Sequence, residues 1–163
     1  MSNCCSSHCE GAPPAPGKRY CPECGQTGTS VERQTLVHLL LEPLTGKIGE
    51  GAYYFCATPA CTTVYFPASA GRVFTKADLK VRVGIKETED PVPICYCFDH
   101  TRASAWAEIE RTGKSTILDS IKREVKAGRC RCEITNPSGK CCLGDVTRVV
   151  QEGLRRFGQK RGR

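Results

Sequence analysis

The sequence predicts an α+β protein built from two small modules, the first β-rich and the second helical. Short runs of aromatic and β-branched residues, separated by turn residues, occur before residue 90 and are typical of strands. After residue 94, apolar residues recur with helical spacing. Between these parts, Thr88-Glu89-Asp90-Pro91-Val92-Pro93 has the charges and prolines of a hinge. We therefore expect three segments, covering residues 1–19, 20–90 and 91–163.

Residues 1–19 are expected to form a tail and linker. A Cys/His cluster is followed by Gly11-Ala12-Pro13-Pro14-Ala15-Pro16-Gly17, a composition typical of linkers. The segment has no apolar run like that of a secretory signal, and the sequence has no run long enough to cross a membrane. We therefore expect a cytoplasmic protein with reduced thiols and no membrane insertion.

Residues 20–90 contain four strand candidates. Two of them, 52–56 and 62–66, are rich in aromatic and β-branched residues and flank a turn at Thr58-Pro59-Ala60. Residues 34–41 form a mostly apolar run, and residues 80–85 alternate polar and apolar as a half-buried strand would. Within the first of these runs, His38 is expected to be a partly buried strand residue rather than a metal ligand.

Residues 94–163 contain three helix candidates. The first includes Trp106 and is expected to end at Gly113, and the second is expected to begin at Ser115 or Thr116 and to end at Gly128. The third carries an apolar stripe of Val146, Val149, Val150, Leu154 and Phe157. Trp106 and Phe157 are expected in the core. His100 either caps the first helix or lies close enough to the neighbouring cysteines to influence them, and capping is the simpler role.

Thirteen cysteines in 163 residues point to metal as the element that stabilises these small modules. An odd number of cysteines in a reducing compartment argues against a closed disulfide framework. The formal net charge is +7, which alone would suggest a nucleic-acid partner. Two four-thiolate metal centres would lower it to about +3. The remaining basic residues lie largely in the tail at 155–163, so no nucleic-acid partner is expected.

The first set of candidate ligands suits a structural zinc ion. Cys21-Pro22-Glu23-Cys24 is a C-x2-C turn followed by glycine, and Cys56 and Cys61 form a C-x4-C pair between two predicted strands. Four thiolates from two turns are typical of a zinc-ribbon-like site, and they leave no open position for water. The alternative is four reduced thiols without metal.

The second set has six cysteines, two more than one site needs. Cys95 and Cys97 follow the hinge, and the others, Cys130, Cys132, Cys141 and Cys142, lie in two later pairs. The spacing favours a [2Fe–2S] cluster, with a second zinc ion or unmetallated thiols as alternatives. Spacing alone does not choose Cys130 over Cys132, or Cys141 over Cys142. At the start of the third helix, Cys142 would place free N–H groups near the cluster.

Several motifs resemble one known family. They are Cys21-Pro22-Glu23-Cys24, Tyr54-Phe55-Cys56 with Cys61, Val64-Tyr65-Phe66, residues 82–87, Cys95-Tyr96-Cys97 and residues 135–142. On these, residues 20–142 resemble the N-terminal domain of CopZ-type copper chaperones, and the whole chain resembles iron–sulfur metallochaperones. The helical half is similar to the [2Fe–2S] domain of bacterioferritin-associated ferredoxin.

The resemblance implies specific ligands. The family's zinc ligands correspond to Cys21, Cys24, Cys56 and Cys61, and its [2Fe–2S] ligands to Cys95, Cys97, Cys132 and Cys142. Two departures matter. The chain lacks the M-x-C-x-x-C motif of the copper chaperones, since its only methionine is Met1, and Cys130 has no equivalent among their ligands. The resemblance therefore does not by itself imply copper transfer.

A third cluster, made of Cys4, Cys5, His8 and Cys9, lies in the tail. Soft thiolates on a mobile arm suit a transferable ion such as Cu(I) or Hg(II), and a tail of reactive thiols without metal is the alternative.

The sequence predicts a metallochaperone-like protein of metal homeostasis, with a metal-transfer or redox protein as its partner. No nucleophile with a base and no phosphate-binding loop is present, so we expect no catalytic residues and no enzyme beyond redox activity of the cluster. The alternatives are a ferredoxin-like electron-transfer partner of a reductase and a zinc-ribbon nucleic-acid binder.

Overall fold

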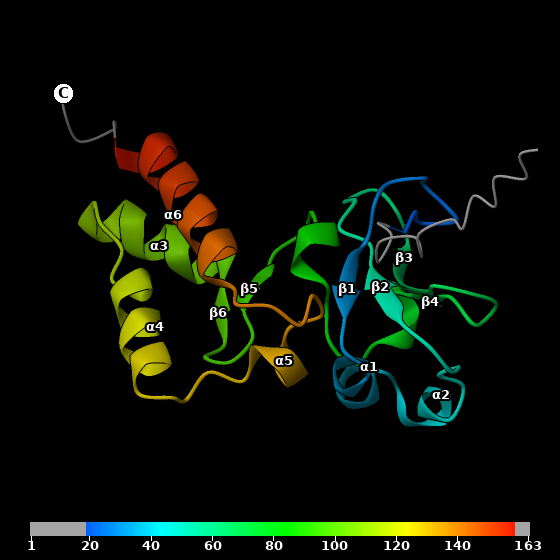
Figure 1. Cartoon of the computed structure of the whole chain (residues 1–163). Coiled ribbons are helices and arrows are strands. Elements are labelled where there is room, and N and C mark those ends of the chain that lie inside the picture. Colours follow the sequence, from blue (N-terminus) through cyan, green and yellow to red (C-terminus); the bar gives the residue numbers. More distant parts are fainter. Residues whose placement is uncertain (1–18, 159–163) are drawn as a thin grey trace, which may run out of the picture.

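The computed structural model describes residues 19–158 and shows a sheet-containing part beside a helical part (Figure 1). The first part consists of β1 (Thr29–Val31), α1 (Arg33–Leu39), α2 (Glu42–Thr45), β2 (Tyr53–Phe55), β3 (Thr63–Pro67), β4 (Phe74–Thr75), and the 3-10 turns η1 (Lys76–Asp78) and η2 (Gly84–Lys86). The second part consists of β5 (Pro93–Cys95), β6 (His100–Thr101), α3 (Arg102–Thr112), α4 (Ile117–Lys126), α5 (Cys132–Thr135) and α6 (Leu143–Phe157). The predicted α+β class is therefore confirmed.

The sheet is antiparallel, with the strand order β1-β2-β3-β4. Its two central strands, β2 and β3, are the two aromatic runs expected from the sequence, and Tyr54 pairs with Phe66 across them. The rings of this pair stack at a centroid distance of 5.7 Å. The sheet is short, and the loop that joins its two central strands carries both Cys56 and Cys61.

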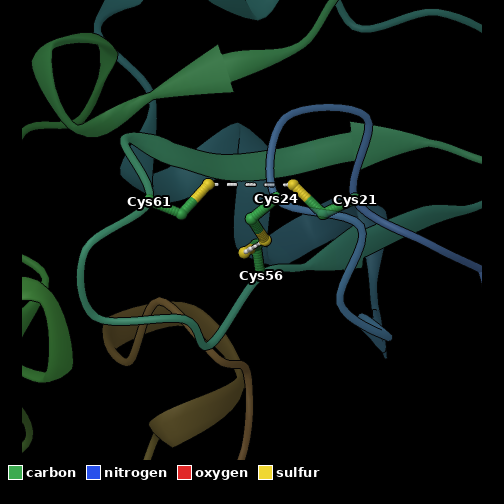
Figure 2. Close-up of side chains that lie close together, drawn as sticks. All are labelled: Cys21, Cys24, Cys56 and Cys61. Atoms are coloured by element: carbon green, nitrogen blue, oxygen red, sulfur yellow. Dashed lines mark hydrogen bonds between the residues drawn. The ribbon is translucent and has the colours of Figure 1, made fainter.

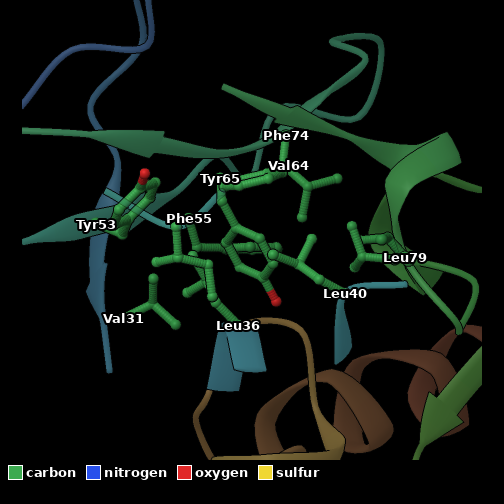
Figure 3. Close-up of a cluster of buried hydrophobic side chains, with 11 residues drawn as sticks. Val31, Leu36, Leu40, Tyr53, Phe55, Val64, Tyr65, Phe74 and Leu79 are labelled. Atoms are coloured by element: carbon green, nitrogen blue, oxygen red, sulfur yellow. The ribbon is translucent and has the colours of Figure 1, made fainter. Parts of the chain in front are cut away.

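One core lies between this sheet and α1 (Figure 3). Its buried members are Val31, Leu36, Leu40, Ile48, Tyr53, Phe55, Val64, Tyr65, Phe74, Leu79 and Val83. Four of these eleven side chains, Tyr53, Phe55, Val64 and Tyr65, belong to the two expected aromatic strands that the structure contains.

Residues 34–41 are mostly helical, so the prediction of a strand there is wrong. Leu36, Leu39 and Leu40 are buried, while His38 is exposed and bonds to the carbonyl of Gln34. Buried residues at i, i+3 and i+4 are the pattern of an amphipathic helix, which a run this short does not distinguish from a buried strand. The expectation that His38 is a partly buried strand residue fails with it.

The strand predicted at 80–85 is also wrong, since this segment lies outside every strand of the described residues. Val83 is buried as the alternation implied, but no strand pairs with its backbone. The hydroxyl of Tyr96 instead accepts from the Gly84 N–H at 2.8 Å and donates to the Arg82 carbonyl at 2.9 Å. A side chain thus satisfies backbone groups that the sequence pattern assigned to a ladder.

The three predicted helices of the second part are confirmed as α3, α4 and α6. Gly113 and Gly128, the expected ends of the first two, have φ of 77° and 72°, which glycine adopts without strain. The first helix is capped by Thr101, whose hydroxyl accepts from the Ser104 N–H, so the capping role considered for His100 is wrong. The strands β5 and β6 and the short helix α5 were not predicted.

The helical core centres on the contact between α3 and α6, which lie side by side in Figure 1. Trp106 and Phe157 are partly buried against it, and the Trp106 indole donates to the Val149 carbonyl at 3.0 Å. Gly153 allows this approach, because a Cβ there would lie 2.6 Å from Cδ1 of Trp106.

Two hydrogen bonds, one buried and one part-buried, and a helix contact are among the interactions that join the two parts. The Thr35 hydroxyl donates to the Glu133 carbonyl at 2.6 Å, and the Tyr65 hydroxyl donates to the Pro137 carbonyl at 2.7 Å. The helix α5 lies against α1, between the two halves of the molecule (Figure 1). The boundaries at residues 19 and 90 stay predictions. The parts on either side of residue 90 are in contact with each other.

Among residues 19–158, none of the helices combines the length and apolarity needed to cross a bilayer.

Candidate metal centres

Cys21, Cys24, Cys56 and Cys61 point toward one another at one end of the sheet (Figure 2). The Sγ atoms of Cys21 and Cys61 are 3.8 Å apart, and those of Cys24 and Cys56 are 3.7 Å apart. All four sulfurs lie within 4.8 Å of one another. Three of the four side chains are buried, and Cys24 is half-buried.

Two local structures bring these thiols together. The first is the C-x2-C turn, in which the Gly25 N–H donates to the Cys21 carbonyl at 2.8 Å and Gly25 has φ of 71°. The second is the loop between β2 and β3, where the Cys56 N–H still donates to the Val64 carbonyl at 2.9 Å. One pair is therefore tied to its own turn and the other to the ladder of the sheet.

This donor set fits a zinc ion. Zinc–thiolate bonds of about 2.3 Å in a tetrahedron place neighbouring sulfurs about 3.8 Å apart. Two of the sulfur separations here, 3.7 and 3.8 Å, match that spacing. Four thiolates complete the tetrahedron, so the arrangement can hold an ion but leaves no position for a substrate.

The environment of this group makes its thiols unequal. A hydrogen bond to the Thr58 hydroxyl, at 3.3 Å, lowers the pKa of Cys24 to about 6. Burial raises the pKa of Cys61 and that of Cys21 above their usual values. Of these three thiols, the half-buried Cys24 is therefore the one whose pKa is lowered.

Two charged residues that the sequence did not single out support this site. Glu23, inside the turn, accepts from the Thr63 hydroxyl at 2.7 Å and from its N–H at 3.0 Å, and these bonds lower the pKa of Glu23 to about 2. Lys86 is buried, and its Nζ donates to the carbonyls of Thr58 and Cys61 at 2.7 and 3.0 Å. The position of Glu23 inside the motif was a usable signal, whereas nothing in the sequence marks Lys86.

A second group of cysteines lies in the helical part. Cys97, Cys130 and Cys132 have sulfurs within 4.8 Å of one another, and the Cys97–Cys132 distance is 3.5 Å. Cys95 and Cys142 are buried in the same core. The Cys142 thiol is hydrogen-bonded to Cys132 and to Cys95, and these bonds raise the pKa of Cys142.

The structure thus brings together five of the six cysteines considered for this site, and Cys141 is exposed. Cys142 occupies the N-cap position of α6. Hydrogen bonds from Cys142 lower the pKa of Cys132 to about 5 and that of Cys95 to about 7. Burial raises the pKa of Cys97 and raises that of Cys130 to about 12, so the thiols of this group are unequal.

The second group fits an iron–sulfur cluster in its chemistry. Thiolates are the usual ligands of such clusters, and buried surroundings with N–H donors to sulfur tune them. Here the Arg131 N–H donates to Cys97 Sγ at 3.2 Å, and the Thr135 hydroxyl lies 3.2 Å from the same sulfur. His100 is half-buried in β6 and belongs to neither group of close ligand atoms among the described residues.

The candidate ligands Cys4, Cys5, His8 and Cys9 lie outside the described residues. So does most of the basic end of the chain, residues 159–163.

Similarity to known proteins agrees with this arrangement. Residues 18–80 match the model of a CopZ-type family described as a zinc binding domain. The chain is 40% identical over 130 residues to the copper chaperone CopZ of Archaeoglobus fulgidus. The aligned region covers 79% of this chain and 60% of that protein. It therefore spans less than two thirds of the length of this relative. The X-ray structure of the N-terminal domain of that CopZ matches with a TM-score of 0.67 and 37% identity, covering 80% of this chain and 97% of the domain.

Proposed function

The chain belongs to the family of CopZ-type N-terminal domains, and on this premise we propose that it is a metallochaperone-like protein of metal homeostasis. The proposal includes a structural zinc ion, a redox-active [2Fe–2S] cluster and a soft metal as cargo. The observation that carries it is the presence of two separate groups of close thiols in a chain that matches nearly all of the CopZ N-terminal domain.

In this proposal, Cys21, Cys24, Cys56 and Cys61 hold the zinc ion. Its role is structural, because a closed four-thiolate site offers no place for a ligand to react. Zinc would join the C-x2-C turn to the loop between β2 and β3, next to the core of the sheet. Binding energy of this kind contributes directly to folding, so removal of zinc is expected to loosen this part of the chain.

The [2Fe–2S] cluster is assigned to Cys95, Cys97, Cys132 and Cys142. When bound, such a cluster donates or accepts one electron. The protein's own contribution is to bury three of these side chains and to direct the Arg131 N–H at Cys97. Both features stabilise negative charge on sulfur in a site with little water.

The cargo is proposed to be a soft metal such as copper or mercury. An electron from the cluster would reduce Cu(II) to Cu(I), which thiolates prefer, so reduction would favour capture. The residues proposed to hold the cargo are Cys4, Cys5, His8 and Cys9. Transfer to a partner protein would proceed by exchange of one thiolate for another.

The first experiment is a metal analysis of protein purified without oxygen. We expect about two iron, two sulfide and one zinc per chain, with the visible absorption of a [2Fe–2S] protein. Cys21→Ser should remove zinc, and Cys95→Ser should remove iron while leaving zinc in place. A colourless, folded protein without iron would contradict the cluster, and folded protein without zinc would contradict the structural site.

A second experiment separates a metal carrier from an electron-transfer protein. Copper(I) titration against a competing chelator should show an additional site that is lost when residues 1–10 are removed. The truncated protein should keep its zinc and its visible spectrum, which makes it the matched control. Unchanged copper affinity after truncation, together with fast electron exchange with a reductase, would favour the ferredoxin-like alternative.

A further inference from the structure

The second group of thiols has one more member than a cluster with four protein ligands can use. Cys130 Sγ lies 3.3 Å from Cys132 Sγ and 4.0 Å from Cys97 Sγ. The third side of this triangle, from Cys97 to Cys132, is 3.5 Å. Any two of the three sulfurs are therefore separated by roughly the distance of about 3.8 Å expected for two thiolates on one tetrahedral ion. Cys130 and Cys132 are equally suited, by distance, to share a metal with Cys97.

The contacts of Cys97 and the position of Cys130 involve the same short segment of the chain. Cys97 receives the Arg131 N–H at 3.2 Å and lies 3.2 Å from the Thr135 hydroxyl. Cys130 belongs to the segment between α4 and α5, which is neither helix nor strand. That segment begins at Gly128, where φ is 72° and no atom lies within 4 Å of the position of a Cβ. Cys97 is thus held partly by Arg131, a residue of the segment that carries Cys130, so the chain keeps these two sulfurs near each other.

Cys130 is also protected from water to an extent that a spare surface thiol would not be. It packs against the helical core as a partly buried side chain, while Cys141, the other unassigned cysteine, is exposed. A thiol that is turned inward beside two ligand sulfurs is available to the same metal ion.

We infer that Cys130 is a fifth ligand of the cluster, which exchanges with Cys132 at the iron that Cys97 binds. This inference rests on the proposed function, because it requires the cluster. In the exchange, the iron–sulfur bond to Cys132 breaks and a bond to Cys130 forms. The Cys130 thiol releases its proton and the freed Cys132 thiolate takes one up, so no electron is gained or lost.

The test compares Cys130→Ala, Cys132→Ala, the double variant and Cys95→Ala, all purified without oxygen. Cys95 is buried and lies outside the triangle, so its loss serves as the control that no neighbouring thiol should rescue. Iron, sulfide and zinc are measured, and the reduced proteins are examined by electron paramagnetic resonance. Both single variants of the triangle should retain the cluster, with Cys132→Ala showing shifted g values. The double variant and Cys95→Ala should lose it and keep zinc.

A wild-type protein without iron would overturn the proposed function itself. Wild type with a cluster, and Cys132→Ala with zinc and native helix content but no cluster, would overturn only the inference. If Cys132→Ala does not fold, the exchange is tested on the wild-type protein by alkylating its free thiols and locating the label. Cleavage after glutamate yields one peptide, residues 125–133, that carries both cysteines. Exchange predicts label at either cysteine while the visible spectrum persists, and label at Cys130 alone would overturn it.

Discussion

At the scale of single residues, Lys86 joins the loop between β2 and β3 to the rest of the sheet-containing part. Its side chain is buried, and its ammonium group donates to two backbone carbonyls of the loop that carries Cys56 and Cys61. A buried cation next to four thiolates also offsets the negative charge that a zinc–thiolate centre carries. Both effects favour the same loop conformation.

Lys86→Met is therefore expected to destabilise the protein by about 2–3 kcal/mol, since it leaves two carbonyls without their charged donor. Zinc should also be lost faster to a chelator, as followed with a colorimetric zinc indicator. Lys80→Met is the matched control, because Lys80 is exposed on the same segment. Equal rates of zinc loss in the two variants would show that Lys86 does not support the site.

Glu108 supplies a second prediction, which concerns pH. Its carboxylate accepts from the Thr116 hydroxyl at 2.6 Å, the Thr116 N–H at 3.1 Å and the Ser115 hydroxyl at 3.0 Å. Burial alone would raise the pKa of Glu108, but these hydrogen bonds outweigh it and hold the pKa below its usual 4.5. The carboxylate of α3 thereby satisfies a free N–H at the start of α4.

Because the pKa of Glu108 is lower in the folded state, its contribution to stability is complete above about pH 4.5 and is lost as the pH falls through the folded value. Glu108→Gln should cost about 1 kcal/mol at pH 7, as loss of a helix cap does. The difference between wild type and variant in the free energy of unfolding, measured with urea, should become smaller below about pH 4.5. A difference that stays constant down to pH 3 would contradict this, since metal loss in acid affects both proteins.

At the scale of elements, the contact between α3 and α6 depends on the absence of a side chain at Gly153. A Cβ there would lie 2.6 Å from Trp106 Cδ1 and 2.8 Å from Ile109 Cδ1, and the Trp106 atom belongs to a rigid ring. Helices that approach this closely separate when a methyl group is added between them.

Gly153→Ala is expected to destabilise the helical part by about 1–3 kcal/mol, although alanine favours helices more than glycine does. Gly158→Ala is the control, because it ends the same helix with nothing within 4 Å of its Cβ position. Thermal unfolding followed by circular dichroism compares the two. A Gly153→Ala protein as stable as wild type would mean that Trp106 moves aside without cost.

At the scale of the whole molecule, the two candidate metal centres belong to parts of the chain that are hydrogen-bonded to each other. Tyr65 is in the sheet core and Thr35 is in α1, and both donate to carbonyls of the 133–137 segment that follows Cys132. Such bonds connect the packing of the sheet-containing part to the position of a candidate cluster ligand. The expected consequence is that the two parts unfold together.

The double variant Thr35→Val with Tyr65→Phe should uncouple them. Each change removes a donor and leaves a carbonyl unsatisfied, at about 1–2 kcal/mol each. Calorimetry should show one transition for wild type and two, or one broadened transition, for the variant. Tyr20→Phe is the control because Tyr20 is 68% exposed. A single sharp transition in the double variant would show that other contacts couple the parts.

The sequence predicted the elements whose signals are local. Glycines that end helices, the aromatic strands around the 57–61 turn and the stripe of α6 all act within a few residues, and the structure has them in place. The strand predictions at residues 34–41 and 80–85 were wrong. In these short segments, apolar side chains such as Leu36 and Val83 are buried by residues distant in sequence. In both segments the secondary structure is decided by what covers the run, which for 34–41 is the sheet.

The candidate cysteines of each centre could be read from the chain alone, because turn chemistry and spacing restrict where thiols can point. Folding in three dimensions was needed to show that Cys130 faces inward beside Cys97, that Cys141 is exposed, and that Lys86 bonds to the loop between β2 and β3. The physical reason is the same in each case. Convergence of side chains from separate loops depends on how the sheet and the helices pack, and this packing joins residues with no common local pattern.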